Sequence, residues 1–378
     1  MERVVCWIVA ISLCIALICP VEAAGNVSLS AHAAILLDAA TGEVLYEKNA
    51  DEQMRIASTT KILTALVALE EASPCQVITV AQDHMVEGSS MYLTVGEQRT
   101  VEELLYGSTY YAGDGSPLLK PCYVYTPYGY DPEDEETRYD VFYFMHGFLC
   151  NANSMFEGDE GAIGNIFDWL IYEKKTKPFI AVALTWDYEN AIRDFDTSYK
   201  QILQFHLEFR QDILPAVEGK YHTYAKATDS KSLRESRDHR AFGGYSMGAV
   251  TTWQVYMLCG DLCRYFAPLA CDSWPTAQFD GAKKPTETAE TLASASKVFR
   301  LSPEDYVIWC GVGDRDQTMM QMIPQLVEMW KFTPEDREPP FNRDNLSLHL
   351  LPGYQHGVPA CEQLLGIVLP EFFPGNAD

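Results

Sequence analysis

The sequence predicts an α/β fold in which helices cover both faces of a β-sheet. From residue 122 onward, short apolar segments alternate with helical segments, a pattern typical of such sheets. Hydrophobic residues make up 47% and charged residues 21% of the 378 residues, as in an ordinary folded domain. The chain before residue 108 follows a different pattern, which predicts a separate N-terminal piece.

The expected elements of residues 108–378 follow one another in strand–helix order. We expect strands at 122–126, 141–146, 179–184, 239–243, 265–270, 306–310 and 346–351. We expect helices at 163–172, 199–217, 246–258, 318–331 and 361–372.

The first residues resemble an export signal. Arg3 precedes an uncharged apolar run, 4–19, and small residues follow at Ala23 and Ala24. This pattern predicts a signal peptide in residues 1–24, with an uncleaved anchor as the alternative. We therefore expect a secreted or cell-surface protein, without stable membrane insertion after signal cleavage.

The following segment, 25–107, opens with a predicted hairpin. Apolar strands are expected at 33–38 and 43–47, on either side of a turn at Thr41-Gly42. A helix at 58–71, a strand at 76–80 and a second helix that begins at Val101 are expected to follow.

Charge and cysteine usage exclude several kinds of partner. The 53 acidic and 28 basic residues give a formal charge of −25, which disfavours nucleic acid and anionic membranes as partners. The 11 cysteines show no paired spacing with histidine, so no metal site is expected and most thiols are interpreted as free. The oligomeric state is not predicted.

A glycine-flanked serine predicts a nucleophile. The segment Gly244-Tyr245-Ser246-Met247-Gly248 matches G-x-S-x-G between a predicted strand and a predicted helix. This context turns the serine hydroxyl out of the sheet edge. The backbone amide of Met247 is then expected to form one half of an oxyanion hole.

The base and the acid should follow the serine in the chain. Two histidines do so: His356 lies in a loop able to reach over the sheet and is preferred, whereas His349 lies inside a predicted strand. Asp314 follows the strand at 306–310 and is preferred as the acid, with Asp316 as its rival.

The second oxyanion amide is expected from the loop after the strand at 141–146. His146 and Gly147 open this loop, and Phe148 or Leu149 supplies the amide, with Phe148 preferred and His146 given a structural role.

These motifs together resemble the family-one carbohydrate esterases, the feruloyl and acetyl-xylan esterases among the esterase D-like α/β-hydrolases. The resemblance covers residues 108–378 and includes the segments Tyr123–Tyr130 and Asp212–Pro215. It implies an α/β-hydrolase sheet and ester hydrolysis through an acyl-enzyme on Ser246, without a cofactor. The implied substrates are polysaccharide-linked or small esters. Trp274 and Trp186 follow predicted strands and are candidate pocket residues, with packing in the core as the alternative.

The N-terminal piece resembles the opening of a D-alanyl-D-alanine carboxypeptidase of the penicillin-binding proteins. Ser58 and Lys61 form an S-x-x-K motif at the start of the helix expected at 58–71. The later S-x-N and K-T-G elements of that family do not occur in this sequence, so the site is interpreted as vestigial.

We therefore expect an exported serine esterase that acts on acyl or feruloyl esters of plant polysaccharide. The alternatives are a D-alanyl-D-alanine carboxypeptidase acting on peptidoglycan through Ser58 and Lys61, or a carbohydrate-binding protein without catalysis.

Overall fold

The computed structural model describes residues 31–38, 41–52, 78–79, 98–99, 101–156, 163–187, 194–332 and 339–375. The chain divides into two compact units, residues 1–72 and 73–378. The expected signal peptide and the helix expected at 58–71, with Ser58 and Lys61, lie outside the described residues.

The first unit contains the predicted hairpin. Strands β1 (Ala34–Leu37) and β2 (Val44–Lys48) pair in antiparallel fashion. The Asp38 carboxylate accepts a 2.8 Å hydrogen bond from the Thr41 backbone N–H, and Gly42 takes φ 73°, which a tight turn requires. The hairpin prediction is confirmed.

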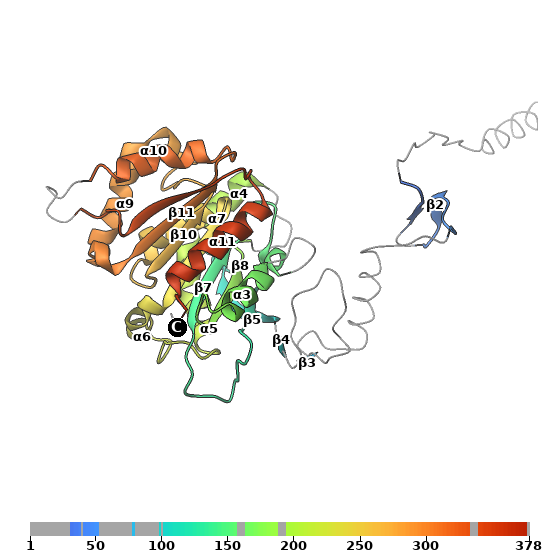
Figure 1. Cartoon of the computed structure of the whole chain (residues 1–378), viewed down its shortest axis with the longest axis horizontal. Helices are drawn as coiled ribbons and strands as arrows, with labels where there is room; N and C mark the ends of the chain where they lie inside the picture. Colours follow the sequence, from blue (N-terminus) through green and yellow to red (C-terminus); the bar gives the residue numbers. More distant parts are fainter. Residues whose placement is uncertain are drawn as a thin grey trace, which may run out of the picture. The chain divides into compact units, whose positions relative to one another are not determined.

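The second unit is built on an eight-stranded sheet with the order β5-β6-β8-β7-β9-β10-β11-β12 (Figure 1). Its strands are β5 (Val101–Thr109), β6 (Pro117–Tyr125), β7 (Asp140–Met145), β8 (Phe179–Leu184), β9 (Arg240–Tyr245), β10 (Tyr265–Leu269), β11 (Val307–Gly313) and β12 (Leu346–Leu351). Strands β7 to β12 run parallel, whereas β5 and β6 are antiparallel to their neighbours. A short pair, β3 (Ile78–Thr79) and β4 (Gln98–Arg99), precedes the sheet.

Helices cover both faces of this sheet, as predicted. On one face, α3 (Ile163–Tyr172) lies beside α11 (Val358–Phe372); on the other face, α4 (Phe195–Glu208) packs against α7 (Met247–Cys259) (Figure 1). The chain continues from α4 through a π-helical turn, η3 (Phe209–Ile213), into α5 (Leu214–Glu218). The remaining helices are α6 (Ser230–Glu235), α8 (Asp280–Lys283), α9 (Pro285–Phe299) and α10 (Met319–Met329). Short helical turns are η2 (Ala152–Met155), η4 (Arg237–His239) and η5 (Pro303–Asp305).

Strands β8 and β9 are buried along their whole length, which explains the continuous apolar sequence of β8 and the pairing of Arg240, the first residue of β9, with Glu218. Because six parallel strands share one direction, their carboxyl ends meet at one edge of the sheet. The loops after β7, β8, β9, β10, β11 and β12 therefore converge there, and these loops carry the candidate site residues.

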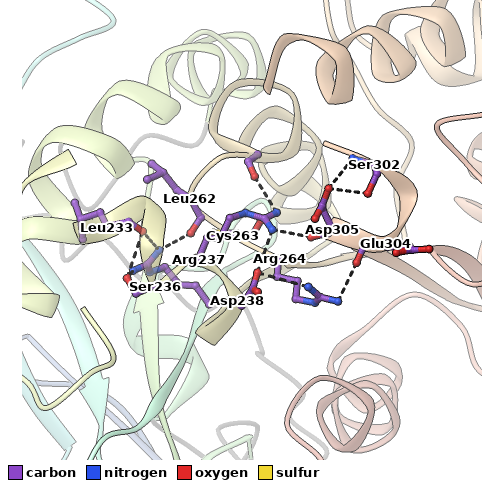
Figure 2. Close-up of polar contacts among 12 residues, drawn as sticks. Leu233, Ser236, Arg237, Asp238, Leu262, Cys263, Arg264, Ser302, Glu304 and Asp305 are labelled. Atoms are coloured by element: carbon purple, nitrogen blue, oxygen red, sulfur yellow. Dashed lines mark hydrogen bonds and ion pairs between the residues drawn. The ribbon is translucent and has the colours of Figure 1, made fainter. Parts of the chain in front are cut away.

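Two arginines hold the opposite edge of the sheet together (Figure 2). Arg237 donates to the carbonyl oxygens of Cys263 at 2.8 Å and Asp305 at 2.7 Å. Arg264 donates to Glu304 O at 2.9 Å. Guanidinium groups have several donors and bind several carbonyls at once, so this cluster links the amino ends of β9, β10 and β11.

The segment at Val101 is the edge strand β5, so the helix expected there is wrong. Its side chains alternate: Tyr106 and Ser108 are buried, whereas Leu105 is exposed. The segment pairs with β6 along nine residues, and this long-range pairing overrides the local helical pattern. The predicted boundary after Gly107 therefore falls inside a strand of the second unit.

Strand β5 also closes a buried ion pair. Lys120 on β6 and Glu208 on α4 are 2.8 Å apart and are almost completely buried. The Tyr106 hydroxyl donates a 2.6 Å hydrogen bond to Glu208. Burial raises the pKa of Glu208, although the Lys120 ammonium opposes this rise. Tyr106 thus supplies the buried Glu208 carboxylate with a hydrogen-bond donor in addition to Lys120.

Candidate active site

Ser246 lies at the sharp turn between β9 and α7. Its backbone has φ 57° and ψ −119°, a strained conformation for a residue with a side chain. Its backbone N–H donates a 2.8 Å hydrogen bond to Leu269 O, which ties the turn to β10. Met247 is the first residue of α7, so the expected oxyanion amide lies at the positive end of the helix dipole.

The two glycines of the motif are required by close contacts between backbones. A Cβ atom at Gly244 would lie 2.2 Å from the carbonyl oxygen of Gly248. A Cβ atom at Gly248 would lie 2.1 Å from Met145 O and 2.6 Å from His146 O. Only glycine fits at either position, and the start of α7 therefore packs directly against the carboxyl end of β7.

The loop after β7 borders the nucleophile. A Cβ atom at Gly147 would lie 3.9 Å from Ser246 Oγ. Residues 147–150 form a turn, in which Cys150 N–H donates to Gly147 O at 3.2 Å and Leu149 has φ 69°. Phe148 and Leu149 are the central residues of this turn, so both candidate oxyanion amides lie in a loop adjacent to Ser246.

His146 fixes the direction of this loop. Its Nδ1 lies 2.8 Å from Gly147 O, and its Nε2 lies 2.8 Å from the Thr185 hydroxyl. Its ring packs on Trp186 with 4.2 Å between ring centroids. Burial lowers the pKa of His146 to about 4, so the ring is neutral and Nδ1–H donates to Gly147 O. The C=O of Gly147 and the N–H of Phe148 belong to one trans peptide group and point in opposite directions. The hydrogen bond that holds Gly147 O therefore also orients the Phe148 N–H.

The structure pairs His356 with Asp316, and the preference for Asp314 is wrong. His356 Nδ1 lies 2.7 Å from Asp316 Oδ2, and this carboxylate is buried. The Thr318 backbone N–H and hydroxyl donate to Asp316 Oδ1 at 2.8 and 2.7 Å. Asp314 instead accepts a 2.7 Å hydrogen bond from Gly353 N–H and so holds a turn.

The Asp316 carboxylate is held in its ionised form. Burial raises its pKa, but the hydrogen bonds from His356 and Thr318 outweigh burial and bring the pKa below its ordinary value. An ionised acceptor at Nδ1 keeps the His356 proton on that nitrogen and leaves Nε2 able to accept a proton.

His349, the other candidate base, lies on β12 opposite Gly311 of β11. Its ring stacks on Trp309 with 5.4 Å between centroids. This position in the interior of a strand agrees with the packing role that the sequence indicates.

The two tryptophans proposed for the pocket are buried. Trp186 is 1% exposed and lies against His146, which agrees with packing in the core, the alternative that the sequence leaves open. Trp274 is 2% exposed and donates a 2.8 Å hydrogen bond to Asp272 Oδ1. It packs in an aromatic cluster with the half-buried Phe195 and Phe279, at centroid distances of 5.7 and 4.7 Å.

Three residues of this site were not singled out by the sequence. Thr318 binds Asp316, Thr185 binds His146, and the Tyr245 hydroxyl contacts both the acid loop and the histidine loop. Tyr245 is the first of the two variable residues of the G-x-S-x-G motif, and nothing in the sequence distinguishes it from a packing side chain.

Neither a metal-binding cluster nor a membrane-spanning helix occurs in the described part of the chain. No group of three or more His, Cys, Asp or Glu side chains among these residues is arranged to hold a metal ion. None of the described helices is both long enough and apolar enough to cross a bilayer. Six buried cysteines in the described ranges are free thiols, in agreement with the interpretation of most thiols as free: Cys122, Cys259, Cys263, Cys271, Cys310 and Cys361.

The fold defines the class of the protein. A mainly parallel sheet, a strained serine between a strand and a helix, and a His–Asp pair at the same sheet edge are the features of the α/β-hydrolases.

Comparison with solved structures identifies the family. A protein designated FAE is 31% identical, with a TM-score of 0.62 over 79% of this chain and 95% of that chain. A mutant of the feruloyl esterase module from Clostridium thermocellum, solved with sinapinate, is 32% identical, with a TM-score of 0.59 over 73% of this chain and 90% of that chain. This chain belongs to the feruloyl esterase family.

Curated sequences match both parts of the chain. Endo-1,4-beta-xylanase Y of Acetivibrio thermocellus is 34% identical over 265 residues, which cover 70% of this chain and 23% of that protein. A family model of D-alanyl-D-alanine carboxypeptidases matches residues 20–116. The carboxypeptidase DacF of Bacillus subtilis is 36% identical over 100 residues, or 25% of this chain and 26% of that protein. The chain thus spans about a quarter of the length of these two relatives.

Proposed function

We propose that the second unit is a serine esterase that hydrolyses acyl or feruloyl esters of plant polysaccharide. The observation that carries the proposal is the pairing of His356 with the buried Asp316 at the sheet edge that also bears the strained Ser246 turn. The relatives support the substrate class, because they include feruloyl esterases and a xylanase.

The reaction uses only groups of this chain and water. His356 Nε2 takes the Ser246 hydroxyl proton while Oγ bonds to the ester carbonyl carbon, and the amides of Met247 and Phe148 bind the resulting oxyanion. The alcohol then leaves with the proton from His356. Water, deprotonated by His356, attacks the acyl-enzyme, and the free acid leaves as Ser246 recovers its proton.

The test is Ser246→Ala on the full chain, assayed with methyl ferulate and 4-nitrophenyl acetate. Loss of a triad nucleophile should lower kcat by at least about a thousandfold. Ser294→Ala is the matched control, since Ser294 lies on α9 and binds only Glu290 O of its own helix. Near-normal turnover by Ser246→Ala would refute the proposal, and no turnover by the wild-type chain would favour a non-catalytic carbohydrate-binding protein.

We also propose that the chain is exported and that Ser58 and Lys61 form no working carboxypeptidase site. The family match supports a carboxypeptidase origin for residues 20–116. Acylation by a β-lactam also needs groups that orient it and stabilise its charge, and the sequence lacks the motifs that supply them. A fluorescent penicillin should leave the chain unlabelled; a labelled band that Ser58→Ala abolishes would show an active site.

A further inference from the structure

Tyr245 contacts the segments that carry Ser246, Asp316 and His356. It immediately precedes Ser246, and only 7% of its surface is exposed. Its hydroxyl oxygen accepts a 3.0 Å hydrogen bond from the backbone N–H of Gly357, the residue after His356. The same hydroxyl lies 3.5 Å from Asp316 Oδ2. Its ring lies 5.0 Å from the His356 ring, between centroids.

These contacts leave the hydroxyl with one orientation. A phenol has a single proton to donate and accepts through oxygen, so accepting from Gly357 directs its proton toward Asp316. Burial raises the pKa of Tyr245, so the hydroxyl keeps this proton at neutral pH. Asp316 Oδ2 therefore receives the His356 Nδ1–H and lies next to a second donor.

The contact with Gly357 restrains the loop that carries His356. Gly357 is the N-cap of α11, and its carbonyl oxygen accepts from the backbone N–H groups of Ala360 and Cys361 at 3.1 and 3.2 Å. The loop is therefore tied to α11 through this carbonyl and to the end of β9 through its N–H and Tyr245.

We propose that Tyr245 is a positioning residue that holds His356 and Asp316 in register with Ser246. This inference rests on the proposed function. The tyrosine touches no substrate atom in the mechanism; it acts through His356 by fixing the loop and the carboxylate that orient the imidazole.

The first test is Tyr245→Phe in the full chain, which removes the hydroxyl and keeps the ring. We expect kcat for methyl ferulate to fall about tenfold, as for the loss of one hydrogen bond to Gly357 and of the long contact with the ionised Asp316, with KM changed less than twofold. Tyr256→Phe is the matched control, because Tyr256 is also buried and its hydroxyl donates a 3.3 Å hydrogen bond to Leu292 O. It should keep kcat within twofold of the wild type. Circular dichroism confirms that both variants are folded.

The second test is a double-mutant cycle with His356→Ala, using 4-nitrophenyl acetate to measure the residual rate. If Tyr245 acts through His356, adding Tyr245→Phe to His356→Ala should cause no further loss of kcat. An equal tenfold loss in both backgrounds would overturn the inference, as would unchanged kcat in Tyr245→Phe alone. Failure of the proposed function is separate, since it would appear as activity that survives Ser246→Ala.

Discussion

The neutral, buried His146 should make the protein lose stability steeply in mild acid. Burial lowers its pKa to about 4, whereas an unfolded chain has a histidine pKa of about 6.5. Between these values the unfolded chain binds a proton that the folded protein does not. The free energy of unfolding therefore decreases as the pH is lowered, by up to about 1.4 kcal/mol per pH unit. From pH 7 to pH 4 this amounts to about 3 kcal/mol.

The variant His146→Asn isolates this contribution. Asparagine keeps a donor near the position of Nδ1 for Gly147 O, but it has no titratable ring and loses the contacts with Trp186 and Thr185. Urea unfolding followed by tryptophan fluorescence at pH 7, 6, 5 and 4 gives the free energy of unfolding of both proteins. The wild type should be more stable at pH 7, and its advantage should shrink by about 3 kcal/mol toward pH 4.

A pH-independent difference between wild type and His146→Asn would refute the reasoning, because it would mean that His146 takes up a proton equally in both states. His349→Asn provides a control at pH 7 only, for the cost of replacing a histidine that stacks on Trp309. Ser294→Ala is the control across the pH series, because the exposed Ser294 side chain does not titrate and this variant should differ from the wild type by the same amount at every pH.

Three further predictions concern the triad and the boundary of the esterase. Asp316→Asn should lower kcat by about three to four orders of magnitude, because it favours the wrong tautomer of the His356 imidazole. Asp314→Asn should keep kcat within about tenfold of the wild type. A larger loss of kcat in Asp314→Asn than in Asp316→Asn would restore Asp314 as the acid. His356→Ala should lower kcat as much as Ser246→Ala does in steady-state assays, and His349→Ala should lower kcat by less than about threefold. Removing residues 1–107 cuts most of β5 away and should lower the thermal midpoint by more than 5 °C relative to a chain that keeps β5. Equal midpoints would show that the strand adds nothing to the sheet.

The sequence predicted most of the sheet, because the buried parallel strands are continuous apolar runs between turn residues. It also predicted the serine turn, whose glycines are required by contacts within a few residues of Ser246 and by β7. It missed α9, whose alanine- and serine-rich sequence has a weak apolar face. It assigned β5 to the wrong kind of element, because the partner strand β6 and the buried Glu208 that stabilise β5 are distant in sequence.

The choice between the two aspartates depended on where β11 ends. The sequence places the end at Cys310, but the strand continues to Gly313. Asp314 then directly follows the strand and accepts the Gly353 N–H across from β12, while Asp316 lies in the next turn and reaches His356. An apolar sequence pattern does not predict the end of a strand to within two or three residues. The sequence could therefore place the catalytic acid in this loop, but it could not decide between Asp314 and Asp316.

The backbone conformation of Ser246 determines which residue would be the most stable at this position if catalysis were not required. At φ 57° a β-carbon is strained by about 1 to 3 kcal/mol, and glycine would adopt the same conformation without that strain. Ser246→Gly should therefore increase the resistance to unfolding while it removes the hydroxyl. Selection for stability alone would favour glycine here, so a serine at this turn marks a position where the hydroxyl is kept at a cost in folding stability.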